Sequence, residues 1–477
     1  RLPLRRGTSQ TALRLPLRGG TSEADANRRP GQGGRRGPKG RNVRATFIRI
    51  LAAALLLLLL PAALWAPEVR LSIQKGFGEK VVIALPLFEG EAGGRVDAEA
   101  VRDVLGFDLS NSGYFSLVEN TAFVDEVESQ DRAEGTINFP EWVALGAEVL
   151  VKGRLEVGLS EFTVEASVYD LARGQPIFGR RYTGEPDEWR HAVHRLSDDI
   201  VRQLTGEPGI ASTRIAFVSN ATGMKEIYVM DYDGANQRRV TRDGSMSIYP
   251  DWFPGTDSII CTQYRGSRQE TYRMDVSSGA GERVTSFPGL NAFPAVSPDG
   301  GEITLSLSRD GNTEIYRVRA DGTNPRRLTF GRSTESSPRW SPDGRRIAFV
   351  SDRAGSPQIY MMSANGGNAE RVTYRGSYNT SPDWSPKGDL MAYTSRVEGV
   401  FQICTVDIET KEVVRLTAGP GHKEDPSWAP DGRHVAYSVK SGGKTDLYMI
   451  DIYDLEPVKL TSGTGDYTSP AWSGRVE

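Results

Sequence analysis

The stretch PRWSPDGRRIAFVSDRAGSPQIYMM, residues 338–362, contains an aromatic residue, a turn, a strand, a charged loop and a second strand. Ser-Pro-Asp-Gly predicts a tight turn, because proline presets φ, aspartate caps locally and glycine tolerates positive φ. The alternation in RIAFVS places successive side chains on opposite faces of a sheet. The stretch therefore predicts a unit of short antiparallel strands.

This unit recurs every 44 residues. The proline that opens it is found at Pro250, Pro294, Pro338, Pro382, Pro426 and Pro470, and the second residue after each is Trp252, Val296, Trp340, Trp384, Trp428 or Trp472. Strand-like repeats of about 40–45 residues are typical of β-propeller blades. Gly, Pro and Asp-Gly punctuation disfavours a helical repeat. We expect the tryptophans to pack between neighbouring blades.

The two ends of the repeat region complement each other. The first strand core, residues 214–219, has no tryptophan before it, and the last tryptophan unit, residues 469–473, has no strand after it. Joining the two would bury the strand edges that a linear array exposes. The pattern predicts six blades, with the C-terminal strand serving as the innermost strand of the first blade.

Residues 67–207 alternate strand-like and helix-like stretches and lack the 44-residue repeat. This pattern predicts a small α/β (α+β) domain before the propeller at 208–477. Apolar spacing predicts helices over 98–113 and about 186–204. Strands are expected around VVIALPLF and at VLVKGRLEVG, EFTVEASVYDL and QPIFGRRYTG. We therefore expect two domains in this order.

The N-terminal segment has the features of a targeting signal. Residues 47–66 resemble a signal peptide, with basic residues before a short apolar run, which favours export to the periplasm over a retained membrane anchor. Residues 1–46 read as a disordered or misassigned extension, and a basic nucleic-acid-binding arm is the alternative. The first 66 residues hold 13 Lys and Arg but only two acids, so the rest is acidic and a poor nucleic-acid binder. Two cysteines, Cys261 and Cys404, exclude a disulfide-stapled fold.

Motifs for catalysis or metal binding are missing from the sequence. We find no GxSxG elbow, P-loop or HExxH. His191, His194 and Asp198 could face one side of a helix, but such histidines are more often solvated, and no Cys/His cluster supports them. The stretch DYDG at 231–234 reads as a hairpin turn rather than a calcium loop. We therefore predict no enzyme, no metal and no cofactor.

Function should lie where the copies differ. The loops that enter the innermost strands and those that follow RIAFVS and its equivalents should open on one face. Their mixture of charges and aromatic residues suits protein recognition. The candidates are Tyr249, Asn291, Phe293, Glu335, Ser336, Ser337, Thr380 and Asp425 in the first set, and Arg265, Arg309 and Arg353 in the second.

The chain resembles the TolB family of periplasmic propeller proteins of the Tol–Pal cell-envelope system. The resemblance covers about residues 67–477 and rests on EVRLSI, VVIALPLF, the linker LTGEPGIASTRIAFVS and six PD40-type units. It implies a non-enzymatic, monomeric scaffold that supports outer-membrane integrity and constriction at cell division. Its mouth would bind a Pal-like lipoprotein, through Leu290 as well, and a TolA-like protein would contact Glu68, Val69, Arg70, Leu71, Ser72 and Ile73.

A propeller hydrolase, or a propeller that gates a peptidase, is the alternative function. It requires convergent acids or histidines at the mouth, or a fused hydrolase domain. A binding scaffold requires only a partner-specific surface. Hydrolase activity of the purified protein would favour the alternative, and recovery of a Pal-like lipoprotein would favour the scaffold.

Overall fold

The computed structural model describes residues 79–90 and 96–475. The first part of the chain forms a five-stranded mixed sheet in the order β2-β1-β3-β4-β5. Strand β1 pairs in parallel with β2 and β3, whereas β3, β4 and β5 are antiparallel. The strands are β1 (Val81–Ala84), β2 (Phe115–Leu117), β3 (Val149–Val157), β4 (Phe162–Asp170) and β5 (Gln175–Gly184).

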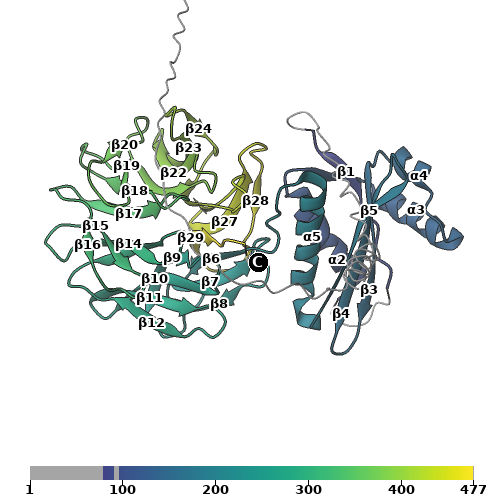
Figure 1. Ribbon diagram of the computed structural model, residues 1–477, viewed down its shortest axis with the longest axis horizontal. Helices are drawn as coiled ribbons and strands as arrows, with labels where there is room; N and C mark the ends of the chain where they lie inside the picture. Colours follow the sequence, from purple (N-terminus) through teal and green to yellow (C-terminus); the bar gives the residue numbers. More distant parts are fainter. Residues whose placement is uncertain (1–78, 91–95, 476–477) are drawn as a thin grey trace, which may run out of the picture. The chain divides into compact units, whose positions relative to one another are not determined.

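Helices cover both faces of this sheet (Figure 1). The helices α2 (Ala98–Ser110) and α5 (Trp189–Thr205) pack on one face and confirm the two predicted helices. A short 3-10 turn, η1 (Pro186–Glu188), precedes α5. The opposite face carries α3 (Thr121–Glu134) and α4 (Phe139–Ala144), which the sequence pattern did not predict.

The described residues after α5 form six four-stranded antiparallel sheets, which confirms the six-bladed propeller. The first blade contains β6 (Arg214–Ser219), β7 (Glu226–Asp231) and β8 (Arg238–Arg239), and the second β9 (Met246–Trp252), β10 (Ser258–Arg265), β11 (Arg268–Asp275) and β12 (Gly281–Thr285). The third contains β13 (Asn291–Val296), β14 (Glu302–Leu307), β15 (Glu314–Arg319) and β16 (Arg326–Arg327), and the fourth β17 (Glu335–Trp340), β18 (Arg346–Ser351), β19 (Gln358–Ser363) and β20 (Glu370–Arg371). The fifth contains β21 (Asn379–Trp384), β22 (Leu390–Val397), β23 (Val400–Asp407) and β24 (Val413–Arg415), and the sixth β25 (His422–Trp428), β26 (His434–Ser441), β27 (Lys444–Asp451) and β28 (Pro457–Lys459).

The last strand, β29 (Tyr467–Trp472), closes the ring. It pairs antiparallel with β6, with Trp472 opposite Ile215, and so completes the first blade as predicted. In Figure 1 the yellow β29 lies beside the teal β6. Each innermost strand contacts the next, from β9 through β25 to β29 and back to β9.

The repeated residues serve the packing of the blades. Trp340 of β17 packs against Ala295 and Ile315 of the preceding blade, and its indole N–H donates to the carbonyl of Ala295 at 3.2 Å. The threonine that ends a repeat accepts a hydrogen bond from a neighbouring strand, as Thr329 Oγ1 does from the Ile315 N–H at 2.9 Å. These positions are therefore structural, as expected for residues that recur in every copy.

The expectation of a solvated histidine pair on α5 is wrong for one of its members. His191 is exposed, but His194 is only 2% exposed, and its Nδ1 lies 2.8 Å from Asp108 Oδ2 on α2. The polar side of α5 is covered by other polar groups, including the Tyr232 hydroxyl, which donates to Asp108 at 2.8 Å. Sequence spacing does not reveal such a cover, because it comes from distant parts of the chain.

Cys261 and Cys404 are both buried and free, in agreement with the sequence interpretation. Within residues 79–90 and 96–475, no helix has the length and apolar character needed to cross a membrane. The expected signal segment, residues 47–66, lies outside the described residues.

Candidate functional site

A ring of six residues surrounds the central opening of the propeller, one from each innermost strand. Each stands just before the proline that opens its repeat, and each has φ between +49° and +56°. The strand register shifts at this point in every blade, so the residue sits on a bulge. The ring lines one pocket together with Arg339 and consists of Tyr249, Phe293, Ser337, Ser381, Asp425 and Ser469.

The ring has an aromatic side and a polar side. The rings of Tyr249 and Phe293 lie 4.2 Å apart between centroids at an interplanar angle of 34°. On the other side, Asp425 accepts hydrogen bonds from Ser381 Oγ at 2.8 Å and Ser469 Oγ at 3.1 Å. Burial, together with the Asp425 carboxylate, raises the pKa of Tyr249 to about 12, so its hydroxyl stays protonated at neutral pH.

Deeper in the opening, charged residues tie neighbouring strands together. Asp251 Oδ2 accepts from the Val296 N–H at 2.8 Å, and Asp383 Oδ2 from the Trp428 N–H at 2.7 Å. Burial raises the pKa of both carboxyls, that of Asp383 to about 6, although Arg339 opposes the shift. These groups hold the channel wall together below the ring.

The position two residues before the ring has a different role. Asn291 is fully buried, and its side chain bonds to both backbone groups of Phe287 and to the Gly289 carbonyl. Glu335 is 1% exposed and accepts from Ser351 Oγ at 3.0 Å and Arg353 Nη2 at 2.9 Å. The side chains of these two predicted site residues therefore stabilise their own loops through buried hydrogen bonds.

The three predicted arginines are exposed, Arg265 at the end of β10 and the other two in loops, and all three lie against aromatic rings. The guanidinium of Arg265 lies 4.5 Å from the ring of Tyr272, and that of Arg353 lies 4.7 Å from Tyr360. Arg309 stands 4.9 Å from the Phe287 ring. Cation–π contact of this kind helps to fix the side chain. The guanidinium groups also bond within the propeller, since Arg265 donates to Gln263 and pairs with Asp243, and Arg353 donates to Ser351 and Glu335.

A second pocket opens between the first and sixth blades. It is lined by groups of both charges, among them Lys225, Lys440, Glu424 and Asp466, and it shares Asp425 with the ring. Its walls come from the loops after β6 and β26 and from the strands β25 and β29. Both predicted sets of loops thus contribute to one surface.

The structure brings together some of the predicted residues and separates others. Tyr249, Phe293, Ser337 and Asp425 share the ring pocket. Ser336 and Thr380 are partly exposed beside it, and Leu290 is partly exposed in the loop before β13. Residues 68–73, expected to contact a TolA-like protein, lie outside the described residues.

Sequence reasoning missed Arg339, Asp251 and Asp383, as well as the charged pocket between two blades. The deeper acids occupy the position just before the repeat tryptophan, which varies between copies. That variation was a usable signal, because a strand position that holds Asp, Ala, Arg or Ser in different copies is not set by one shared packing requirement. The charged pocket gave no signal, since its walls come from opposite ends of the repeat region.

Two family models match the chain. Residues 69–177 match the TolB amino-terminal domain, and residues 201–476 match the TolB beta propeller domain. The crystal structure of TolB from Acinetobacter baumannii superposes with a TM-score of 0.73 at 28% identity, over 84% of this chain and 98% of that chain. Fold and sequence therefore agree over both domains.

Curated relatives carry the name Tol-Pal system protein TolB. The protein from Desulfosudis oleivorans is 35% identical over 220 residues, which cover 46% of this chain and 50% of that protein. The protein from Geobacter metallireducens is 38% identical over 218 residues, which cover 45% and 49%. The chain thus spans about half the length of the curated relatives it matches.

Proposed function

The chain belongs to the TolB family, and from this premise we propose that it is a non-enzymatic protein-binding scaffold of a Tol–Pal system in the periplasm. Its propeller mouth binds a Pal-like peptidoglycan-associated lipoprotein, and its N-terminal segment couples to a TolA-like inner-membrane protein. Through these two partners it supports outer-membrane integrity and constriction at cell division. The two domains act as one monomeric adaptor.

The composition of the mouth supports the proposed site for the Pal-like partner. An aromatic pair, Tyr249 and Phe293, lies on the same surface as a pocket of mixed charge. Asp425 lines both the ring pocket, which contains the pair, and the charged pocket. Protein interfaces are enriched in aromatic anchors and arginines surrounded by polar groups. The stacked arginines Arg265 and Arg353 extend this surface outward.

The ring pocket does not offer the groups that a hydrolase uses. Ser381 and Ser469 donate to Asp425, but the lining contains no histidine or cysteine among the described residues. A serine needs an adjacent general base to become a nucleophile. The arrangement favours recognition over catalysis.

Calorimetric titration of the purified chain with the soluble domain of a Pal-like lipoprotein tests this proposal. We expect Phe293→Ala and Tyr249→Ala each to weaken binding at least tenfold, which is about 1.4 kcal/mol, because central aromatic anchors dominate interface energies. Phe123→Ala is the matched control, since Phe123 is an exposed phenylalanine on α3 of the other domain. Equal affinity of all variants, or hydrolase activity of the wild-type chain, would contradict the proposal.

The proposed TolA-like contact is tested separately by deleting residues 68–73. The shortened chain should lose the TolA-like protein in a pull-down and keep its affinity for the Pal-like domain. Loss of both partners would show that the segment supports the fold instead.

A further inference from the structure

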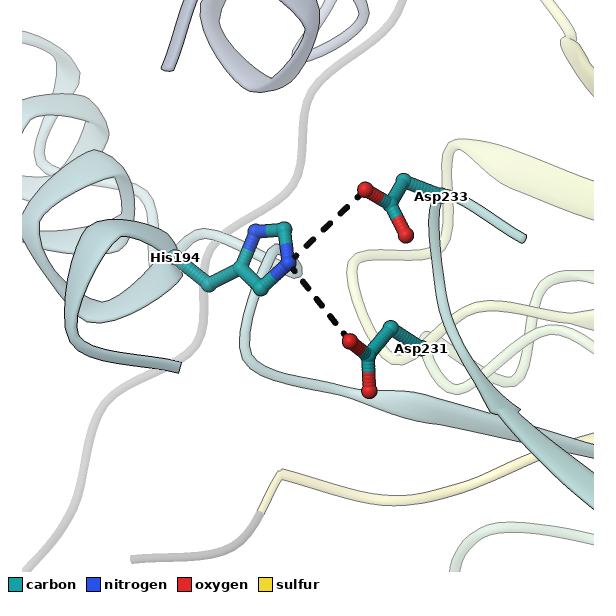
Figure 2. Close-up of side chains that lie close together, drawn as sticks. All are labelled: His194, Asp231 and Asp233. Carbon is teal, nitrogen blue, oxygen red and sulfur yellow. Dashed lines mark ion pairs between the residues drawn. The ribbon is translucent and has the colours of Figure 1, made fainter. Parts of the chain in front are cut away.

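A cluster of polar groups lies between α5 and the turn that joins β7 to β8, away from the mouth. Figure 2 shows the imidazole of His194 facing the carboxylates of Asp231 and Asp233. His194 Nε2 is 4.0 Å from Asp231 Oδ2 and 3.8 Å from Asp233 Oδ2. The three possible ligand atoms, one from each residue, all lie within 4.8 Å of one another.

The imidazole has one satisfied nitrogen and one unsatisfied nitrogen. Nδ1 is 2.8 Å from Asp108 Oδ2, but the buried Nε2 has no hydrogen-bond partner. The His194 side chain is only 3% exposed, so this nitrogen is shielded from bulk solvent. A buried polar atom without a partner costs about 1–3 kcal/mol and therefore indicates an occupant.

The surroundings of His194 have the form of an outer ligand shell. When Nδ1–H donates to a carboxylate, the imidazole is fixed in the tautomer that leaves the Nε2 lone pair free. Asp108 supplies that carboxylate and is itself held by the Tyr232 hydroxyl at 2.8 Å. This carboxylate–histidine pair is the usual support of a metal-binding histidine.

The charges in the cluster do not balance. Arg190 pairs with Asp233 and lies 3.9 Å from Asp231, but it provides one positive charge against the carboxylates of Asp108, Asp231 and Asp233. The hairpin turn holds the two ligand carboxylates in place, since the Ala235 N–H donates to Asp233 and Asn236 donates to Asp231 at 2.7 Å. A divalent cation would neutralise the remaining two charges.

We propose that His194, Asp231 and Asp233 bind a divalent transition-metal ion, with Zn²⁺ as the best match. One imidazole nitrogen and two carboxylate oxygens suit Zn²⁺, whereas Mg²⁺ and Ca²⁺ prefer oxygen ligands alone. Ligands about 2.0–2.1 Å from a tetrahedral zinc ion lie about 3.3 Å apart, so the separations of His194 from Asp233 and Asp231, 3.8 and 4.0 Å, shorten by about 0.5–0.7 Å on binding. The ion clamps α5 to the β7–β8 turn, and a water molecule completes its coordination.

A proton on Nε2 is the competing occupant. Burial lowers the pKa of His194, but the carboxylates of Asp108, Asp233 and Asp231 outweigh that effect and raise it. The cluster thus attracts positive charge by either route. The two occupants differ in one measurable way, because only the metal site gives stoichiometric binding of zinc.

The test is calorimetric titration of the metal-stripped full chain with ZnCl₂ at pH 7.5, paired with thermal unfolding with and without zinc. We expect one zinc ion per chain, a rise in Tm on binding, and no displacement by excess Mg²⁺. His194→Gln and Asp231→Asn should each weaken zinc binding at least tenfold. Asp231→Asn keeps the shape of a partly exposed side chain, so it remains informative if His194→Gln fails to fold.

Two control variants keep the result specific. His191→Gln removes the exposed histidine on the same helix, and His434→Gln removes another buried histidine, whose Nδ1 lies 2.6 Å from Asp431 Oδ2. Both should bind zinc like the wild-type chain. Zinc binding that is absent from the wild type, or that falls as much in the controls as in Asp231→Asn, would overturn the proposal.

Discussion

Tyr249 and Phe293 occupy the same position in consecutive repeats, and their rings meet with centroids 4.2 Å apart at the propeller mouth. Both have positive φ, on bulges that recur in every blade. The aromatic pair is therefore carried by the innermost strands rather than by a mobile loop. A surface built this way is already ordered before a partner arrives, which lowers the entropy cost of binding.

The aromatic pair should show a measurable coupling energy in the isolated protein. We expect a double-mutant cycle of Tyr249→Leu and Phe293→Leu to give about 0.5–1.5 kcal/mol of coupling, since aromatic pairs contribute this much beyond their buried area. Urea unfolding of the four proteins measures it. Additive effects of the two substitutions would mean that the contact contributes nothing to stability.

The bulge makes a second prediction, at Ser337, where φ is +50°. Ser337→Val should destabilise the fold by about 1–2 kcal/mol relative to Ser337→Gly, because β-branched residues rarely adopt a left-handed backbone and glycine does so freely. Ser336→Val is the control, since Ser336 precedes the bulge in the same strand and is not among the residues with positive φ. Equal stability of the valine and glycine variants at 337 would argue against the bulge.

The internal role of Glu335 can be separated from partner binding. Glu335→Ala should cost about 2–3 kcal/mol in the free energy of unfolding, because it removes the buried acceptor for Ser351 and Arg353. Arg309→Ala should cost less than about 1 kcal/mol, since its pair with Asp310 is partly exposed at 3.5 Å. Chemical denaturation of both variants checks this, and a neutral Glu335→Ala would show that the loop is held by other contacts.

Repeat spacing was sufficient to predict the propeller, because each blade must bury the same positions. It was not sufficient for α3, whose buried face includes Glu128 and Asp131 as well as Val124 and Val127. The two acids pair with Lys152 on β3 at 2.8 and 3.1 Å. A helix that buries charged residues lacks the continuous apolar stripe by which sequence reasoning recognises it.

The site was predictable to a similar, partial degree. Chain position identified the mouth-facing segments, but not whether a side chain points into the opening or into its own loop. Asn291 and Phe293 are two residues apart, yet the first is fully buried and the second lines the pocket. The bulge at Phe293 breaks the simple alternation of a strand, and its presence depends on backbone geometry that residue types do not reveal.

Closure of the ring rests on Trp472 of β29, which leads to a fourth prediction. Its indole N–H donates to Thr213 Oγ1 at 2.8 Å, and its ring packs beside Ala429 and Ala436 of the sixth blade. Trp472→Ala should lower stability by about 3–5 kcal/mol and expose the C-terminus to limited proteolysis. Trp340→Ala should destabilise comparably without releasing the C-terminus, because its blade is continuous in the chain. Identical cleavage patterns would count against closure by β29.

Asp383 in the channel wall makes the last prediction, which concerns pH. Its carboxyl faces Arg339 at 3.6 Å and feels the repulsion of Asp251, and burial is the largest of the effects that raise its pKa to about 6. The folded chain therefore keeps a proton that the unfolded chain releases near pH 4, so stability is lost as pH rises from about 4 to 6 and is level above. Asp383→Asn keeps an acceptor for the Trp428 N–H. Its free energy of unfolding should gain about 1–2 kcal/mol over that of the wild type as the pH rises from 4.5 to 7.5.

Asp321→Asn is the control and should show no such gain over this pH range, because the Thr323 hydroxyl holds the pKa of that exposed carboxyl below its usual value. Urea unfolding at the two pH values decides the matter, and a pH-independent difference between Asp383→Asn and wild type would refute the assignment.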